Sequence, residues 1–138
     1  MGTHATATFA VETWDEQPFD ETADGSKLTR ASVTKSFAGD IEGDATLEYL
    51  MAYPADGAVS FVGLERIVGR LGERAGSFVL QHTGLDEGGT TTGTFTVVPG
   101  SGTGDLRGLR GEGGYTLAGH ADRYPVTLDY RIESPLPD

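Results

Sequence analysis

The feature that most constrains the fold is an alternation of apolar and polar residues, which recurs through almost the whole chain. In the last such segment the apolar positions are Tyr124, Val126, Leu128, Tyr130 and Ile132. Because side chains alternate between the two faces of a β-strand, this pattern predicts a strand with one buried and one solvated face. A helical period is almost absent, so the sequence predicts an all-β protein.

Eight alternating segments, separated by turns rich in glycine and proline, cover the chain. We expect strands at residues 4–14, 27–37, 44–53, 58–70, 77–82, 91–98, 106–117 and 124–132, and a long loop at residues 15–26. Short strands at this spacing are typical of an antiparallel barrel or a sandwich. Glycines inside the predicted strands, such as Gly63 and Gly69, favour the barrel because small barrels need bends to close. The sequence therefore predicts one domain, residues 1–138, folded as a single eight-stranded antiparallel up-and-down β-barrel.

Composition excludes several classes of partner. The chain has 138 residues and a net charge of −11, from 10 basic and 21 acidic residues. This balance opposes binding to the phosphate backbone of a nucleic acid or to an anionic membrane surface. There is no cysteine, which excludes disulfides and thiolate chemistry. No segment is long and apolar enough to span a bilayer, and the first residues do not form a secretory signal, so we expect a cytoplasmic protein.

Four charged or titratable residues lie in apolar strand segments and are candidate site residues. Lys35 and His82 each share a predicted strand face with apolar neighbours. In residues 61–70 both faces are largely apolar, so one of Glu65 and Arg66 must point inward, and the alternation leaves open which. A buried charge is costly unless it is paired, so such a residue either has an internal partner or belongs to a functional site.

Other motifs predict no metal, nucleotide or hydrolase site. The glycine-rich run at residues 97–106 lacks the Gly-Lys-Ser/Thr of a nucleotide loop, and its Asp105 would repel a phosphate. The three histidines, His4, His82 and His120, have no paired spacing, so we predict no metal site. No Gly-x-Ser-x-Gly nucleophile motif is present. We expect no cofactor.

A group of motifs gives the chain a resemblance to a known family. These motifs are Trp14 and residues 33–40, 63–66, 76–82, 98–106 and 128–130. Together they resemble DUF3224, an uncharacterised bacterial domain-of-unknown-function family. The resemblance implies an eight-stranded antiparallel barrel, related in fold to plant allene oxide cyclase and more loosely to the lipocalin-type (calycin-like) barrels. It implies no activity, and the catalytic positions of the cyclase cannot be placed on this chain residue by residue.

The leading functional hypothesis is a barrel that binds a small apolar or amphipathic molecule in its interior. An eight-stranded barrel has room for about one small ligand, and an apolar wall with a few polar groups is typical of such pockets. The tyrosines are predicted to line the interior, and the basic residues to hold the polar end of the ligand. The predicted ligand-binding residues are Lys35, Tyr49, Tyr53, Arg66, His82 and Tyr130.

Two alternatives stay open at this point. The first is a cofactor-free isomerase or cyclase, in which His82 or Glu65 moves a proton and Lys35 or Arg66 stabilises developing charge. The second is a structural barrel with a filled core that associates with its own copies. The apolar outer face of residues 61–68 also predicts a homodimer or homotrimer.

Overall fold

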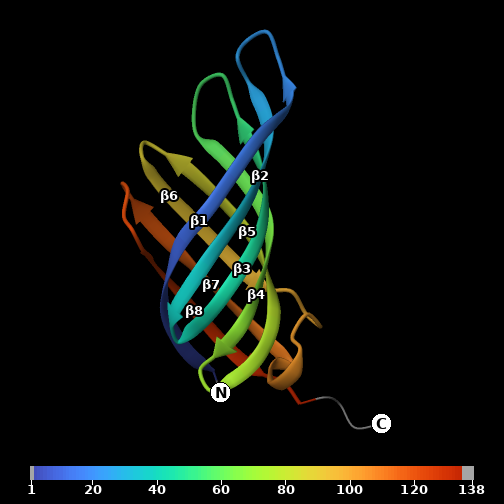
Figure 1. The fold of residues 1–138 in the computed structure, drawn as a ribbon. Helices are drawn as coiled ribbons and strands as arrows, with labels where there is room; N and C mark the ends of the chain where they lie inside the picture. The colour runs from blue at the N-terminus through green and yellow to red at the C-terminus, as the bar shows by residue number, and fades with distance from the viewer. Residues whose placement is uncertain (1, 135–138) are drawn as a thin grey trace.

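The structure, a computed structural model, describes residues 2–134. Eight antiparallel strands follow one another around a closed barrel, and the last strand pairs with the first (Figure 1). The predicted up-and-down β-barrel is therefore confirmed. The strands are β1 (Thr3–Glu21), β2 (Lys27–Gly39), β3 (Ile41–Tyr53), β4 (Val59–Leu71), β5 (Arg74–Glu87), β6 (Thr90–Val97), β7 (Leu109–Ala118) and β8 (Tyr124–Ile132).

A single turn of 3-10 helix, η1 (Gly104–Leu106), lies between β6 and β7. Because this turn occupies residues 104–106, β7 begins at Leu109, whereas the sequence predicts a strand at residues 106–117. Among residues 2–134, no helix is long and apolar enough to cross a membrane.

The prediction of a loop at residues 15–26 is wrong for residues 15–21, because β1 continues as a strand to Glu21. This part of β1 pairs with β2 alone, and the two strands form a hairpin that extends beyond the barrel (Figure 1). A strand with no buried face needs no alternation of apolar residues. The pairing also shifts register between Val11 and Thr13 and between Pro18 and Asp20, and such shifts interrupt the period of two.

The two ends of the barrel differ in how their interiors are filled. We call the end at the β2–β3 and β4–β5 turns the closed end, and the end at the β1–β2, β3–β4, β5–β6 and β7–β8 turns the open end. Large apolar side chains fill the closed end, and burial of each contributes about 1.5–3 kcal/mol. They include Ile41, Ile67, Leu71, Phe78, Leu80, Leu106 and Leu109, all almost fully buried.

A pair of glycines allows two strands of the barrel to approach closely. Gly43 on β3 lies opposite Gly69 on β4. A Cβ atom on Gly43 would lie 2.2 Å from the carbonyl oxygen of Val68, and one on Gly69 would lie 2.0 Å from that of Glu42. No other residue fits at these two positions without a shift of the backbone, so these strand glycines mark a close backbone approach.

Strand β4 has an apolar face on each side of the barrel wall. Glu65 points inward and is 1% exposed, whereas Arg66 lies on the outer face with the exposed Val62, Leu64 and Val68. The structure thus settles which of the two charged residues faces the interior. The homodimer or homotrimer suggested by this outer face stays a prediction, which sedimentation of the protein at micromolar concentration would test.

Candidate functional site

A cavity of about 180 Å³ occupies the open end of the barrel and is partly open to solvent. Aromatic rings from five different strands form much of its wall: Phe9, Tyr49, Phe61, Tyr115 and Tyr124. An apolar protein cavity of about 150 Å³ is large enough to hold benzene. The cavity at the open end therefore has room for a molecule of one ring with a short substituent.

Glycines on neighbouring strands position three of these rings. The ring and the glycine directly opposite it form the pairs Tyr49–Gly63, Phe61–Gly84 and Tyr115–Gly93. A Cβ atom on Gly84 would lie 2.1 Å from Cζ of Phe61, and one on Gly93 would lie 2.4 Å from Cζ of Tyr115. Each ring thus lies flat across a position where any side chain would displace it. In each pair the ring covers a glycine that has no side chain of its own, and the same ring forms part of the cavity wall.

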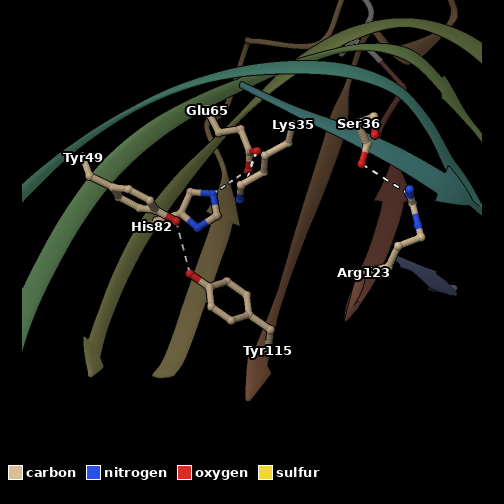
Figure 2. A network of polar contacts seen from close by, with 7 residues as sticks. All are labelled: Lys35, Ser36, Tyr49, Glu65, His82, Tyr115 and Arg123. Atoms are coloured by element: carbon tan, nitrogen blue, oxygen red, sulfur yellow. Dashed lines mark hydrogen bonds and ion pairs between the residues drawn. The ribbon is translucent and has the colours of Figure 1, made fainter. Parts of the chain in front are cut away.

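Three titratable side chains form a buried cluster at the inner end of the cavity (Figure 2). Nζ of Lys35 lies 3.4 Å from Oε2 of Glu65, and Nε2 of His82 lies 2.7 Å from Oε1 of the same carboxylate. All three residues are at most 3% exposed. Within the described part of the chain, Nδ1 of His82 has no hydrogen-bond partner. Removal of an ammonium and a carboxylate from water costs several kcal/mol for each ion, so this cluster lowers stability unless its contacts offset that cost.

The contacts within the cluster shift the pKa values of its members. Burial lowers the pKa of Lys35, and the negative charge of Glu65 offsets only part of this effect. Burial alone would raise the pKa of Glu65, but the charge of Lys35 and the hydrogen bond from His82 outweigh it and keep that pKa below its usual value. Glu65 is therefore an anion at neutral pH, shared between Lys35 and His82.

Two tyrosines, Tyr49 and Tyr115, line the same cavity as Lys35. The hydroxyl oxygens of Tyr49 and Tyr115 are 3.4 Å apart, which is long for a hydrogen bond between hydroxyls, so neither group has a strong partner in the other. Figure 2 shows the two hydroxyls directed toward each other, and both rings lie beside the imidazole of His82, with centroids 6.0 and 6.2 Å from its own. Burial raises the pKa of both tyrosines, so both hydroxyls stay protonated and can donate. We call Lys35, Tyr49 and Tyr115 the cavity floor, since all three line the cavity.

The mouth of the cavity has a different character. Trp14, from the part of β1 just beyond the barrel, is 47% exposed, and its ring centroid lies 5.9 Å from that of Tyr49. The indole Nε1 donates a hydrogen bond of 3.0 Å to Glu16. On the opposite side Asp86 accepts a hydrogen bond of 3.2 Å from Thr91, and both residues line the cavity. The cavity thus has a cation at its floor and a carboxylate at its mouth.

Three of the predicted site residues form the buried cluster, and a fourth lies beside it. Lys35, Glu65 and His82 come together as described, and Tyr49 lies beside them. Of these four, only Lys35 and Tyr49 line the cavity. Glu65 and His82 do not line the cavity, so neither can exchange a proton directly with a ligand there; Lys35, which contacts Glu65 and lines the cavity, can relay one.

The other three predicted ligand-binding residues lie elsewhere. Arg66 is exposed on the outer face of β4, so the prediction that it holds a ligand in the interior is wrong. Tyr53 lies beyond the rim of the barrel, where its hydroxyl donates to Glu16; burial, followed by that hydrogen bond, raises its pKa to about 12. Tyr130 is at the closed end, beside the turn at Gly72. Alternation predicts which face a residue occupies, but not its height along the barrel.

Sequence reasoning missed several residues that line the cavity. Phe9 lies on the apolar face of the first predicted strand, and Phe61 shares the face of Glu65, whose direction the alternation left open. Nothing in the strand pattern separated these two residues from ordinary core residues. Tyr115 and Leu117 share the inward face of β7, and this pattern resembles the one around Tyr49. Asp86 was missed because the predicted fifth strand ended at residue 82, whereas β5 continues to Glu87. Within residues 2–134, no three His, Cys, Asp or Glu side chains are grouped in a way that could hold a metal ion.

Comparisons with known proteins agree with the fold. The model of a family described as "Protein of unknown function (DUF3224)" matches residues 5–130. The crystal structure of a protein with unknown function from the DUF3224 family of Shewanella oneidensis MR-1 is similar to this chain, with a TM-score of 0.78 and 31% sequence identity. That similarity covers 97% of this chain and 100% of the other. A comparison with curated proteins finds no match.

Proposed function

Because the chain belongs to the DUF3224 family, whose function is unknown, we propose a function from the cavity itself. The barrel binds a small, largely apolar molecule of about one ring. An oxygen-bearing head group of this molecule is held at the cavity floor by Lys35, Tyr49 and Tyr115.

The observation that carries this proposal is a buried ammonium at the inner end of an aromatic cavity. Lys35 has three N–H donors. Its contacts are Glu65 at 3.4 Å and the ring of Phe9, whose centroid lies 4.2 Å from Nζ. An acceptor oxygen on a ligand in the cavity can take one of these N–H groups, and a hydrogen bond to a charged group contributes about 1.5–3 kcal/mol. The hydroxyls of Tyr49 and Tyr115 supply two further donors for the same oxygen.

The size of the cavity supports binding over a purely structural role. A filled structural barrel would leave no space larger than a few water molecules. The volume of about 180 Å³ is roughly six times the volume that a water molecule occupies in the liquid. Its aromatic lining also favours an organic ligand over a group of waters.

The isomerase or cyclase alternative has weaker support from the geometry. It needs a general base in contact with the substrate, and the two predicted candidates, Glu65 and His82, do not line the cavity. Lys35 is the member of the buried cluster that a ligand can touch. Binding is therefore the function that the arrangement favours first.

A panel of one-ring compounds tests the proposal. Toluene, benzyl alcohol and benzoate share a size that fits the cavity but differ in the head group. We expect benzyl alcohol and benzoate to raise the melting temperature of the protein and to give saturation-transfer signals in NMR. If no compound of this size binds, with or without an oxygen, the proposal is wrong.

A matched pair of variants locates the binding site. Leu117→Trp places an indole in the cavity, and Val62→Trp places the same group on the outer face of the barrel. We expect the first variant to lose ligand binding and the second to keep it. Equal binding by both folded variants would place the ligand outside the cavity.

A further inference from the structure

We propose that Lys35 forms a reversible imine with an aldehyde or ketone bound in the cavity. The inference rests on the proposed binding function, and it names the ligand class as small carbonyl compounds. It goes beyond binding because it assigns covalent chemistry to one side chain.

The environment of Lys35 favours an amine that can act as a nucleophile. The chain has two lysines, Lys27 and Lys35. Lys27 is exposed at the rim, where its Nζ lies 4.8 Å from the ring centroid of Tyr53. Lys35 is 3% exposed and lines an aromatic cavity. Burial of this kind destabilises the ammonium and lowers the pKa of Lys35, and a lysine in apolar surroundings is a common imine-forming residue.

Glu65 is placed to take the proton that Lys35 must lose. An ammonium has no lone pair, so one proton has to leave before the nitrogen can attack a carbonyl carbon. Oε2 of Glu65 lies 3.4 Å from Nζ and, within the described part of the chain, has no hydrogen-bond partner. Transfer of the proton converts the resting ion pair into two uncharged groups, and burial lowers the cost of this step because it disfavours both charges. His82 holds the carboxyl group in place through its contact with Oε1.

The reaction balances without any other reagent. The lone pair of the neutral Lys35 amine forms a C–N bond to the carbonyl carbon, and one proton moves from nitrogen to the former carbonyl oxygen. The product is a carbinolamine, whose oxygen can accept hydrogen bonds from Tyr49 and Tyr115. The protonated Glu65 then gives its proton to this oxygen, the C–O bond breaks, and water leaves. The result is a protonated imine beside the Glu65 carboxylate, so the original ion pair is restored.

Reductive trapping of the wild-type protein tests the inference. The full chain is incubated with benzaldehyde and sodium cyanoborohydride, which reduces an imine to a stable benzylamine, and the modified peptide is identified by mass spectrometry. We expect about ten times more adduct on Lys35 than on Lys27, because the cavity holds the bound aldehyde beside the Lys35 amine. Benzyl alcohol, which has the same shape but no carbonyl carbon, should slow the labelling of Lys35 and leave that of Lys27 unchanged.

Two variants test which of the two lysines carries the cavity-dependent adduct. Lys35→Arg keeps a positive charge beside Glu65 but cannot form an imine, so the cavity-dependent adduct should disappear. Lys27→Arg removes the exposed lysine and should leave the Lys35 adduct at its wild-type level. The peptide map of the wild-type protein decides the question even if the Lys35 variant does not fold.

The outcomes distinguish the imine from the binding function on which it rests. If benzaldehyde raises the melting temperature but the adduct is spread equally over Lys27 and Lys35, the barrel binds the aldehyde and the imine proposal is overturned. If neither benzaldehyde nor benzyl alcohol binds and Lys35 stays unmodified, both proposals fail.

Discussion

The two ends of the barrel share the same eight strands and the same alternation of side chains, yet one is filled and the other contains a cavity. At the closed end, side chains such as Ile41, Leu71 and Phe78 pack against one another and are almost fully buried. At the open end, rings such as those of Phe61 and Tyr115 each lie over a glycine on the neighbouring strand. The comparison teaches that a shared strand pattern does not decide where a barrel is hollow, and that the wall of this cavity depends on which rings lie over glycines.

The buried cluster lies between these two regions. Along β4, Glu65 is followed by Ile67 toward the closed end and preceded by Gly63 toward the cavity. The well-packed closed end, where each large side chain contributes about 1.5–3 kcal/mol, offsets the cost of the charges. The chain thus combines a half that stabilises the fold with buried charges that cost stability.

The largest expected effect comes from removal of the shared carboxylate. Glu65→Gln leaves the ammonium of Lys35 buried without a counter-charge, which should lower the free energy of unfolding by about 3–5 kcal/mol. The control is Glu48→Gln, which breaks an exposed ion pair with Arg30 on the outer face and should cost about 0–1 kcal/mol. Urea denaturation measures both. Similar losses in the two variants would mean that the cluster carries no buried ion pair.

A matched pair of leucine substitutions compares the two ends directly. Leu71→Ala at the closed end should cost about 2–5 kcal/mol, because it creates a cavity in a packed region. Leu117→Ala at the open end should cost about 1 kcal/mol, because that side chain is partly exposed and already borders a cavity. Thermal or urea unfolding tests the order of the two values, and equal losses would contradict the contrast between the ends.

The pairing of rings with glycines can be broken at one position. The added methyl group in Gly93→Ala would lie 2.4 Å from Cζ of Tyr115 and must push that ring away. We expect a loss of about 1–3 kcal/mol in stability and weaker binding of benzyl alcohol. Thr94→Ala, at the neighbouring exposed position of β6, should change stability by about 0.5 kcal/mol or less. Unchanged ligand affinity in the glycine variant would show that Tyr115 does not shape the site.

The smallest effect is a change with pH. The folded state holds the pKa of Glu65 below its usual value of 4.5. The stability that this group contributes is therefore fully present above that value and is lost as the pH falls through the folded pKa. The difference in unfolding free energy between wild type and Glu65→Gln should shrink between pH 5 and pH 3, relative to its value at neutral pH. A difference that stays constant over this range would contradict an ionised Glu65.

The alternation of the sequence was sufficient to predict the strands because it reports directly which face of each strand is buried, and the glycines inside the strands favoured a barrel over a sandwich. It identified Lys35, His82 and one of Glu65 and Arg66 as charged residues in apolar surroundings. It could not separate the last two, since the outer face of β4 is as apolar as the inner one. Closure of the barrel places one face of β4 inside and the other outside, and only this placement identifies Glu65 as the inward side chain.

The position of a residue along the barrel axis was beyond the reach of the sequence pattern. Tyr49, Tyr53 and Tyr130 share the inward alternation, but the structure places them at the cavity floor, beyond the rim and at the closed end, respectively. Height depends on strand register, which the turns and the shifts in β1 determine. These features involve backbone pairing between distant segments and leave little trace in local composition.

Trp14 lies at the mouth of the cavity, where its intrinsic fluorescence can report the binding of a ligand. It is the only tryptophan of the chain, and its ring lies 5.9 Å from the ring of Tyr49 at the cavity floor. Indole fluorescence responds to changes in polarity and to quenching groups nearby, so a molecule that enters the cavity should alter the emission of this single residue. Collections of small compounds can therefore be screened for ligands with the unlabelled protein, by its intrinsic fluorescence alone.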